Sequence, residues 1–380
     1  MFGLASSSKG KGRHSGKESS SSNKPSRRVA AKRPSASADI ETTFGVELEF
    51  VVCIRKEEVP QGSDEEFFRW ATARLNAQPA LANRVLNSLA RGRSIQYNNW
   101  NLIADSSISG RPDWGATLHG LSEMDARYAY ACQGMELVSP VYEYSNIDSF
   151  ERKLTAVKDA FRRKAFNNET TALHVHMGIP LASSNNPLAS GLTLEVVRVL
   201  FLLWAASEQV IEGFQPDHRH GEVNSHCYSL FDKIKRDRGD LVTRRDRLVL
   251  MAQQLWSCTS RGDIIRNVVG GTPGYCDKKL NISFENTRKP TTIEFREHFG
   301  TLARQDIMHW IKFCHKMLQF AYDNRNRAWT NEWLDNLFER TRSLSQVVTL
   351  IGISTGDAGF LRDRRDKVGR GDYDRVVLCQ

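Results

Sequence analysis

Three short segments of the chain alternate strictly between apolar residues and residues that carry chemical function. They read Val46-Glu47-Leu48-Glu49-Phe50, Leu173-His174-Val175-His176-Met177 and Ile293-Glu294-Phe295-Arg296. Because successive side chains of a β-strand point to opposite faces, each segment predicts a strand with one apolar face. The other face then carries carboxylates, imidazoles or a guanidinium. A solvated sheet face ordinarily carries Thr, Lys, Gln and Ser, so three faces of Glu, His and Arg indicate a site.

The remaining periodicity predicts an α+β fold. Further strands are expected at residues 98–104, as a hairpin across 127–141 that turns at Gln133-Gly134, and at 280–284. Helices are expected at residues 64–91, 145–166, 192–212, 240–256, 304–323 and 331–344. A doubly wound parallel sheet needs nearly continuous apolar strands, and these strands are too polar for burial on both faces. A mostly antiparallel sheet with helices on one side fits better.

The charge distribution separates the chain into a basic tail and a nearly neutral body. The formal net charge is +9, but residues 1–40 hold nine Lys or Arg against Glu18 and Asp39 and so carry +7. Their Ser-rich low complexity predicts a disordered tail. We expect a catalytic domain over residues 41–345 and a partly disordered C-terminal tail over 346–380, whose last 20 residues hold six Lys or Arg and four Asp.

The composition also argues against several classes of protein. The seven cysteines are scattered and form no C-x-x-C, which disfavours a disulfide framework and a zinc ribbon. No apolar run reaches the roughly 20 residues of a membrane span. We expect an intracellular protein, cytoplasmic or nuclear, with mitochondrial import as the weaker alternative. Nucleic acid binding is expected only weakly, through the basic tail.

One further polar cluster has an open interpretation. His218, His220, His226 and Cys227 lie close together in the sequence and are residue types that bind zinc. Their spacing matches no common zinc finger, so a polar loop or a loop beside the substrate is the better interpretation.

The residues on the three polar faces suit phosphoryl chemistry. Carboxylates with an occasional imidazole bind Mg²⁺ or Mn²⁺, and an arginine neutralises a transferring phosphoryl group. Formation of an amide bond needs this combination, because ATP must first convert an unreactive carboxylate into an acyl phosphate. An amine then displaces phosphate.

The motifs together resemble the amidoligase family. They are Phe44-Gly45-Val46-Glu47-Leu48-Glu49-Phe50, Asp105-Ser106-Ser107-Ile108, Glu136-Leu137-Val138-Ser139-Pro140, His174-Val175-His176, Thr292-Ile293-Glu294-Phe295-Arg296 and Gly300-Thr301-Leu302. The resemblance covers residues 42–342 and implies the fold of glutamine synthetase and glutamate–cysteine ligase. That fold is a curved, mostly antiparallel sheet with helices on its convex side, and its concave face binds ATP and metal ions.

The resemblance also implies roles for individual residues. The metal ligands would be Glu47, Glu49, Glu136, His176 and Glu294, with His174 beside them as a ligand or a supporting residue. Arg296 would contact phosphate and act in catalysis. Asp105 would orient or deprotonate the amine, and Glu136 would also belong to the catalytic set. Nucleotide contacts are expected from Asn281, Lys279 and Arg288 in addition to Arg296.

Two other functions remain open at the level of sequence. A metal-dependent hydrolase or phosphatase could use the same ligands, although the Glu-x-Arg pattern favours phosphoryl transfer. A catalytically inactive homologue could keep the fold and bind nucleotide. The expected partners are small-molecule or peptide carboxylates and amines, whose identity the sequence leaves open, as it does the oligomeric state.

Overall fold

The computed structural model describes residues 40–59, 61–87, 96–110, 122–180, 191–219, 227–230, 243–269, 282–284, 292–370 and 377–378. By its contacts the chain divides into residues 1–38 and a compact unit of residues 39–380. All the described residues lie in the second unit. The expected disordered tail, and Asn281, Lys279 and Arg288, lie outside the described residues.

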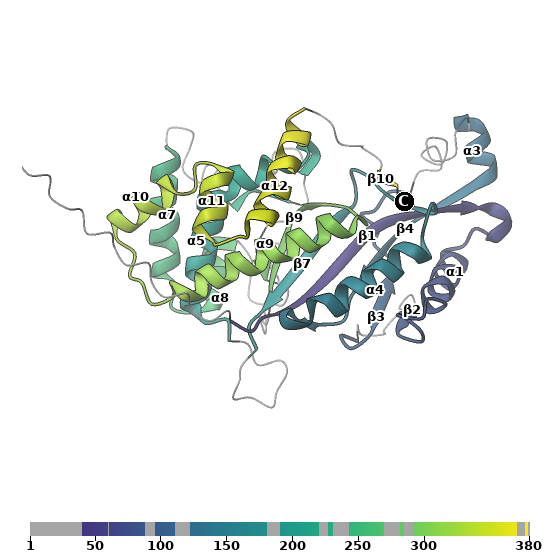
Figure 1. Ribbon diagram of the computed structural model, residues 1–380, viewed down its shortest axis with the longest axis horizontal. Coiled ribbons are helices and arrows are strands. Elements are labelled where there is room, and N and C mark those ends of the chain that lie inside the picture. Colours follow the sequence, from purple (N-terminus) through teal and green to yellow (C-terminus); the bar gives the residue numbers. More distant parts are fainter. Residues whose placement is uncertain are drawn as a thin grey trace, which may run out of the picture. The chain divides into compact units, whose positions relative to one another are not determined.

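A largely antiparallel sheet organises this unit (Figure 1). The strands among the described residues are β1 (Thr43–Arg55), β2 (Val85–Asn87), β3 (Trp100–Ile103), β4 (Tyr130–Val138), β5 (Tyr142–Glu143), β6 (Ala165–Asn167), β7 (Ala172–Gly178), β8 (Ile282–Phe284), β9 (Ile293–Phe299) and β10 (Val377–Leu378). The main order is β2-β3-β4-β1-β7-β9-β8, and only β2 and β3 pair in parallel. The expected α+β class with a mostly antiparallel sheet is confirmed.

The helices account for most of the remaining described residues. The α-helices are α1 (Asp64–Asn76), α3 (Glu123–Ala129), α4 (Ile147–Ala160), α5 (Leu194–Glu212), α7 (Arg244–Ser257), α8 (Arg261–Ile264), α9 (Arg304–Asp323), α10 (Asn331–Glu339), α11 (Leu344–Leu350) and α12 (Thr355–Gly369). Short 3₁₀ turns are η1 (Lys56–Glu58), η2 (Tyr144–Asn146) and η3 (Asp217–Arg219), and a π-helical turn, η4, covers Ile265–Val269.

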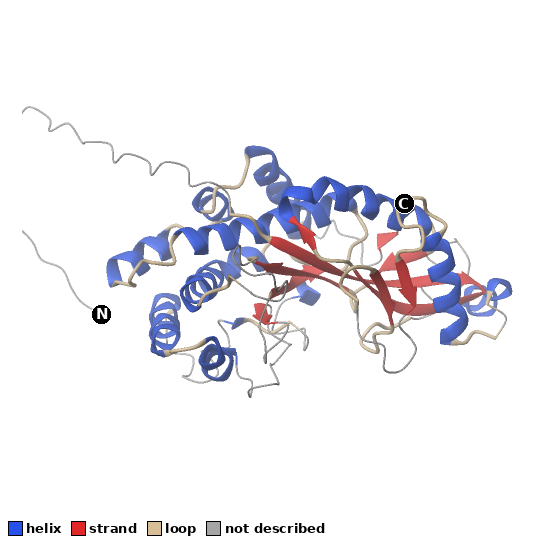
Figure 2. Ribbon diagram, turned by 90° about the horizontal axis from the view of Figure 1, so that it is seen from below, coloured by secondary structure: helices blue, strands red, loops and turns tan. Residues whose placement is uncertain are grey.

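Helices cover the apolar face of the sheet. The Phe44 ring of β1 meets Phe150 of α4 edge-on at 5.2 Å between centroids, and Phe295 of β9 lies 5.3 Å from Trp204 of α5. Helix α9 packs along β7 and α5. Figure 2 shows the long helices along one side of the strands. The polar residues of the three alternating segments therefore lie on the opposite face.

Side-chain caps fix where several helices begin. Ser63, Thr193, Thr243 and Ser354 each accept a hydrogen bond from a backbone N–H in the first turn of the following helix. The helix expected to begin at residue 145 begins later, and Ser145 does not cap it. Its hydroxyl donates to Glu41, and α4 begins two residues later.

The hairpin expected at residues 127–141 is also wrong, since α3 leads into the single strand β4. Gly134 lies inside this strand rather than in a turn. A Cβ at that position would stand 2.6 Å from the carbonyl oxygen of Ile108. The glycine allows the loop that contains Ile108 to lie close to the strand. A local sequence pattern does not distinguish such a glycine from one in a turn.

Along β1, Glu49 is the last polar residue of the polar face, and apolar residues follow it on the same face. Val51 and Cys53 point to the same face as Glu47 and Glu49, but they are buried in a second, small apolar cluster with Ile108, Tyr130 and Phe166. This cluster closes one end of the polar face, so the functional side chains are confined to the other end.

Helices α11 and α12 occupy residues for which the sequence predicted a partly disordered tail. Val347 and Leu361 are buried in the main core. Arg364 lies 3.9 Å from the centre of the Phe299 ring and 3.2 Å from a carboxylate oxygen of Asp306. The prediction was wrong because α12 is rich in charge and docks through a few apolar anchors and polar contacts, which apolar periodicity does not reveal.

Candidate functional site

Strand order brings the three polar segments together. β1 lies between β4 and β7, and β7 pairs with β9 on its other side. In this register Glu47 is opposite His174, and His176 is opposite Glu294. The predicted convergence of these residues is what the pairing produces, because side chains opposite one another on neighbouring strands are close enough to interact.

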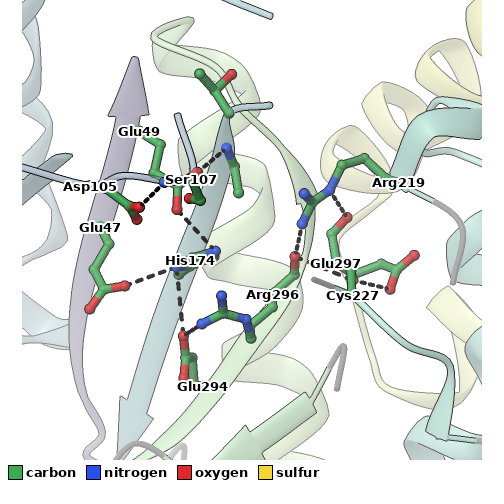
Figure 3. Close-up of polar contacts among 12 residues, drawn as sticks. Glu47, Glu49, Asp105, Ser107, His174, Arg219, Cys227, Glu294, Arg296 and Glu297 are labelled. Carbon is green, nitrogen blue, oxygen red and sulfur yellow. Dashed lines mark hydrogen bonds and ion pairs between the residues drawn. The ribbon is translucent and has the colours of Figure 1, made fainter. Parts of the chain in front are cut away.

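A first group of potential ligands surrounds His174 (Figure 3). Its Nδ1 lies 2.9 Å from Glu47 Oε2 and 3.6 Å from Glu294 Oε1. Glu47, His174 and Glu294 each offer one ligand atom within 4.8 Å of the others. Two carboxylates and an imidazole form a donor set suited to Mg²⁺ or Mn²⁺.

A second group consists of Glu49, Asp105 and Glu136. Glu49 and Glu136 are opposite each other on β1 and β4, and Asp105 lies just after β3. Their oxygens also lie within 4.8 Å of one another. Three carboxylates at this distance repel one another unless a cation or a proton compensates their charge. Asp105, expected to orient the amine, is therefore also placed as a potential metal ligand.

The positions of the two histidines differ from those expected, in which His176 was a metal ligand and His174 a ligand or a supporting residue. His176 Nε2 approaches Glu47 Oε1 at 3.1 Å, but His176 belongs to neither three-residue group among the described residues. His174 lies between the two groups, since its Nε2 is 3.6 Å from Glu49 Oε1. The geometry thus gives His174 the central position that the family pattern suggested for His176.

The surroundings shift the pKa values of these carboxyl groups in opposite directions. Burial alone would raise the pKa of Glu47, but His176 and His174 hold that pKa well below its usual value. Burial, with Glu47 and Glu49 nearby, raises the pKa of Glu136 well above its usual value. Burial also raises the pKa of Glu49, against the opposing effect of His174. The site therefore favours a proton on Glu136 when no cation is present.

Arg296 enters the polar face at an irregularity in β9. Leu173 pairs with His298 and Val175 pairs with Phe295, so Arg296 and Glu297 both lie opposite the single residue His174. Such a bulge re-aims the side chains that it carries. The Arg296 guanidinium pairs with the Glu294 carboxylate. Although burial opposes it, Glu294 and Glu47 raise the pKa of Arg296, which keeps this residue a cation.

Two buried polar atoms at the centre of the site lack a hydrogen-bond partner in the described part of the chain. They are Glu294 Oε2 and Arg296 Nε. A buried acceptor or donor without a partner lowers the stability of the folded protein, and a bound ligand can supply the missing partner. A divalent cation would satisfy the carboxylate oxygen, and a phosphate oxygen would satisfy the guanidinium. The residues present therefore fit both groups.

Two residues beside this site, Arg219 and Glu297, were not among those predicted from the sequence. Arg219 of η3 donates to the main-chain carbonyl of Arg296, and Cys227 Sγ lies 3.3 Å from Glu297 Oε2. Glu297 directly follows the Glu-x-Arg motif, so its proximity could have been inferred. Arg219 could not, because nothing local marks it among the many arginines. Cys227 donates to Glu297 Oε2. His220 and His226 lie outside the described residues, and His218 belongs to no group of potential metal ligands in the described part of the chain.

The first comparison with known proteins concerns protein families. A family model described as "Putative amidoligase enzyme" matches residues 40–318, which is most of the chain. A comparison with curated protein sequences finds no match.

Solved structures provide the second comparison. A bifunctional glutathione synthetase from Pasteurella multocida aligns with 87% of this chain and 47% of its own, at 10% sequence identity and a TM-score of 0.35. The chain thus spans less than half of that synthetase, and the score is too low to carry an argument. A membrane-crossing helix is not found either, since none in the described part of the chain is both long and apolar enough.

Proposed function

The chain belongs to the amidoligase family, and from this premise we propose that it is an ATP-dependent carboxylate–amine ligase. It would form an amide bond, of the isopeptide type if a peptide side chain is a substrate. The acyl group would be activated as an acyl phosphate on the polar face of the sheet.

One observation carries this proposal: carboxylates, an imidazole and a guanidinium from three adjacent strands converge on one buried face. Glu294 is 1% exposed, yet one of its oxygens has no partner in the described residues. Arg296, two residues further on, has a buried Nε in the same condition. A cation bridged to a phosphate would satisfy both atoms at once.

We assign one metal site to each of the two groups of potential ligands. Glu47, His174 and Glu294 would hold one Mg²⁺ or Mn²⁺, and Glu49, Asp105 and Glu136 would hold the other. Such ions supply charge neutralisation between ATP and the carboxylate substrate. His174 would keep both sets of carboxylates in place, since each of its ring nitrogens approaches a different set.

The remaining roles follow from charge and position. Arg296 would bind a phosphate oxygen, since it is held as a cation beside the first group. Glu136 and Asp105 lie on the other side of His174, and a protonated amine would be drawn towards these carboxylates. Asp105 or Glu136 could then accept the proton that the amine must lose before it attacks. Asn281, Lys279 and Arg288 stay proposed nucleotide contacts.

We further propose that the sheet corresponds to the curved sheet of glutamine synthetase and glutamate–cysteine ligase. The antiparallel order of β4, β1, β7 and β9 supports this proposal, as does the confinement of the packed helices to the apolar face. On this basis the nucleotide would lie on the polar face, between the two metal groups and Arg296.

Product analysis tests the proposed function. The protein is incubated with Mg²⁺, ATP, a panel of amino acids that carry a carboxylate side chain, and hydroxylamine as a small amine. We expect ADP release that requires both a carboxylate and hydroxylamine, with one hydroxamate formed per ADP. Phosphate release without an amine would indicate a hydrolase. Absence of Mg²⁺-dependent binding of an ATP analogue in calorimetry would refute the proposal.

A further inference from the structure

The second half of β9 pairs with β7 on one side and receives side-chain hydrogen bonds from residues 215–219. Among the described residues, β8 pairs with β9 only as far as Phe295. Beyond that point Phe299 N donates to Gln215 Oε1 at 3.2 Å, and Arg219 donates to the carbonyls of Arg296 and Glu297. The short segment 215–219, which follows α5, thus satisfies main-chain groups of β9 with its side chains.

Arg219 is buried to an extent that is rare for arginine. The residue is 3% exposed, and its Nε lies 3.5 Å from the Glu297 carbonyl oxygen. A buried guanidinium is costly unless its donors are satisfied, and its planar fork suits two neighbouring acceptors. Its contacts with two successive carbonyls therefore fix the local path of the β9 backbone.

Those two carbonyls belong to the bulge that contains Arg296. Arg296 and Glu297 share one partner position opposite His174, which leaves part of the bulge without regular strand pairing. Arg219 binds both residues of the bulge through their carbonyl groups, and Cys227 Sγ lies 3.6 Å from the same Arg296 carbonyl oxygen. Figure 3 shows Arg219 on one side of Arg296, with the Arg296 guanidinium directed to the other side, towards Glu294.

We infer that Arg219 is a positioning residue, which holds the β9 bulge so that the Arg296 guanidinium stays paired with Glu294 and aimed at the phosphate. This inference rests on the proposed function for the identity of what Arg296 binds. The placement of Arg296 by Arg219 does not depend on it.

Arg219→Met removes the donors and keeps an unbranched side chain, whereas Arg219→Lys keeps the charge but loses the fork. Arg198→Met is the matched control. Arg198 also donates to main-chain carbonyls, those of Leu255, Trp256 and Cys258, but it does so between α5 and the end of α7, away from the polar face. Loss of stability alone should therefore affect both methionine variants alike.

A crystal structure of the metal-free variant gives the first measurement, and it needs no nucleotide. In Arg219→Met we expect the Arg296–Glu294 pair to be broken and the path of residues 296–297 to change, while Arg198→Met keeps both. An unchanged Arg296 in Arg219→Met would overturn the inference, whatever the protein catalyses. If Arg219→Met does not fold, the same comparison is made with Arg219→Lys.

Calorimetry with Mg²⁺ and a non-hydrolysable ATP analogue gives the second measurement. We expect Arg219→Met to weaken binding by about tenfold or more, the effect of losing one charged hydrogen bond, with Arg219→Lys in between.

A double variant separates a positioning role from an independent one. If Arg219 acts through Arg296, Arg219→Met should weaken analogue binding no further in an Arg296→Met background. Fully additive losses would overturn the inference, as would equal losses in Arg219→Met and Arg198→Met. Failure of the wild type to bind the analogue would refute the proposed function, and the crystal structures would then decide the role of Arg219.

Discussion

At the scale of the residue, the site is organised by the opposed pKa shifts of neighbouring carboxyl groups. Glu47 stays ionised because two histidines face it, whereas Glu136 is buried among other carboxylates. The two groups of potential metal ligands therefore differ in whether a carboxyl group must lose a proton before a cation binds. A proton must leave Glu136, whose pKa is raised, whereas the lowered pKa of Glu47 keeps that carboxylate ionised.

The raised pKa of Glu136 predicts a dependence of stability on pH in the absence of metal. The protonated form is favoured in the folded state, so its contribution is complete below the usual value of 4.5 and is lost as pH rises through the raised pKa. Thermal unfolding in EDTA should therefore show the wild type losing stability from pH 5 upwards relative to Glu136→Gln, at about 1.4 kcal/mol per pH unit at most. Parallel curves for the two proteins would contradict this assignment.

The division of ligands predicts the stoichiometry of metal binding. We expect two Mn²⁺ per wild-type chain and one in Glu294→Gln or Glu49→Gln, because each substitution removes one ligand from one group only. Electron paramagnetic resonance titration measures the bound ions. Glu65→Gln, which changes an exposed helix residue paired with Arg69, is the control and should retain two. Loss of both ions in either single variant would mean that the six residues form one shared site.

At the scale of the element, close packing between β4 and the loop after β3 decides where Asp105 lies. The carbonyl of Ile108 lies against the backbone of Gly134, and Ile108 also fills the small apolar cluster with Val51 and Phe166. Contacts with Gly134 and with the small apolar cluster thus fix the loop, and this places Asp105 next to Glu136.

Gly134→Ala should therefore destabilise the protein by about 1–3 kcal/mol and weaken the second metal site, since the added methyl group must displace Ile108. Gly356→Ala in α12 is the matched control, because nothing lies within 4 Å of the Cβ it adds. That variant should keep its stability or gain slightly. Chemical denaturation and Mn²⁺ titration measure the two effects, and equal behaviour of both variants would contradict the packing argument.

Prediction from the sequence succeeded for elements with a strong apolar period. It failed where contacts between segments far apart in the chain determine the local structure. Helix α9 and strand β7 were expected within a residue or two of their observed bounds, because each carries a clear apolar pattern. Gly134 suggested a turn, and only its distance from Ile108 identifies it as part of a strand. The bulge at Arg296 and Glu297 was likewise invisible, because it depends on pairing with His174.

At the scale of the whole molecule, the C-terminal helices are part of the folded unit. Leu344, Val347 and Leu361 are buried in the main core, and Arg364 packs on Phe299 at the end of the strand that carries Arg296. The expected division of the chain at residue 345 does not coincide with a change in packing.

Truncation after Arg342 should therefore lower the unfolding temperature markedly or prevent soluble expression, because it removes several buried apolar side chains and exposes their partners. Removal of residues 1–38 is the contrasting experiment. The low complexity of that segment predicts disorder, so the unfolding temperature and analogue binding should be unchanged. Calorimetry on both proteins checks the pair. A stable protein after the C-terminal truncation would show that α11 and α12 are dispensable.

The sequence by itself determined which side chains share a face, because the two-residue period of a strand is a local property of the backbone. It thereby identified Glu47, Glu49, His174, His176, Glu294 and Arg296 as one polar surface. Tertiary structure alone decided how that surface is divided: strand register placed His174 between two ligand groups, loop packing brought Asp105 to Glu136, and Arg219 met the bulge of β9. Register and packing arise from contacts between segments far apart in the chain, and no local period encodes them.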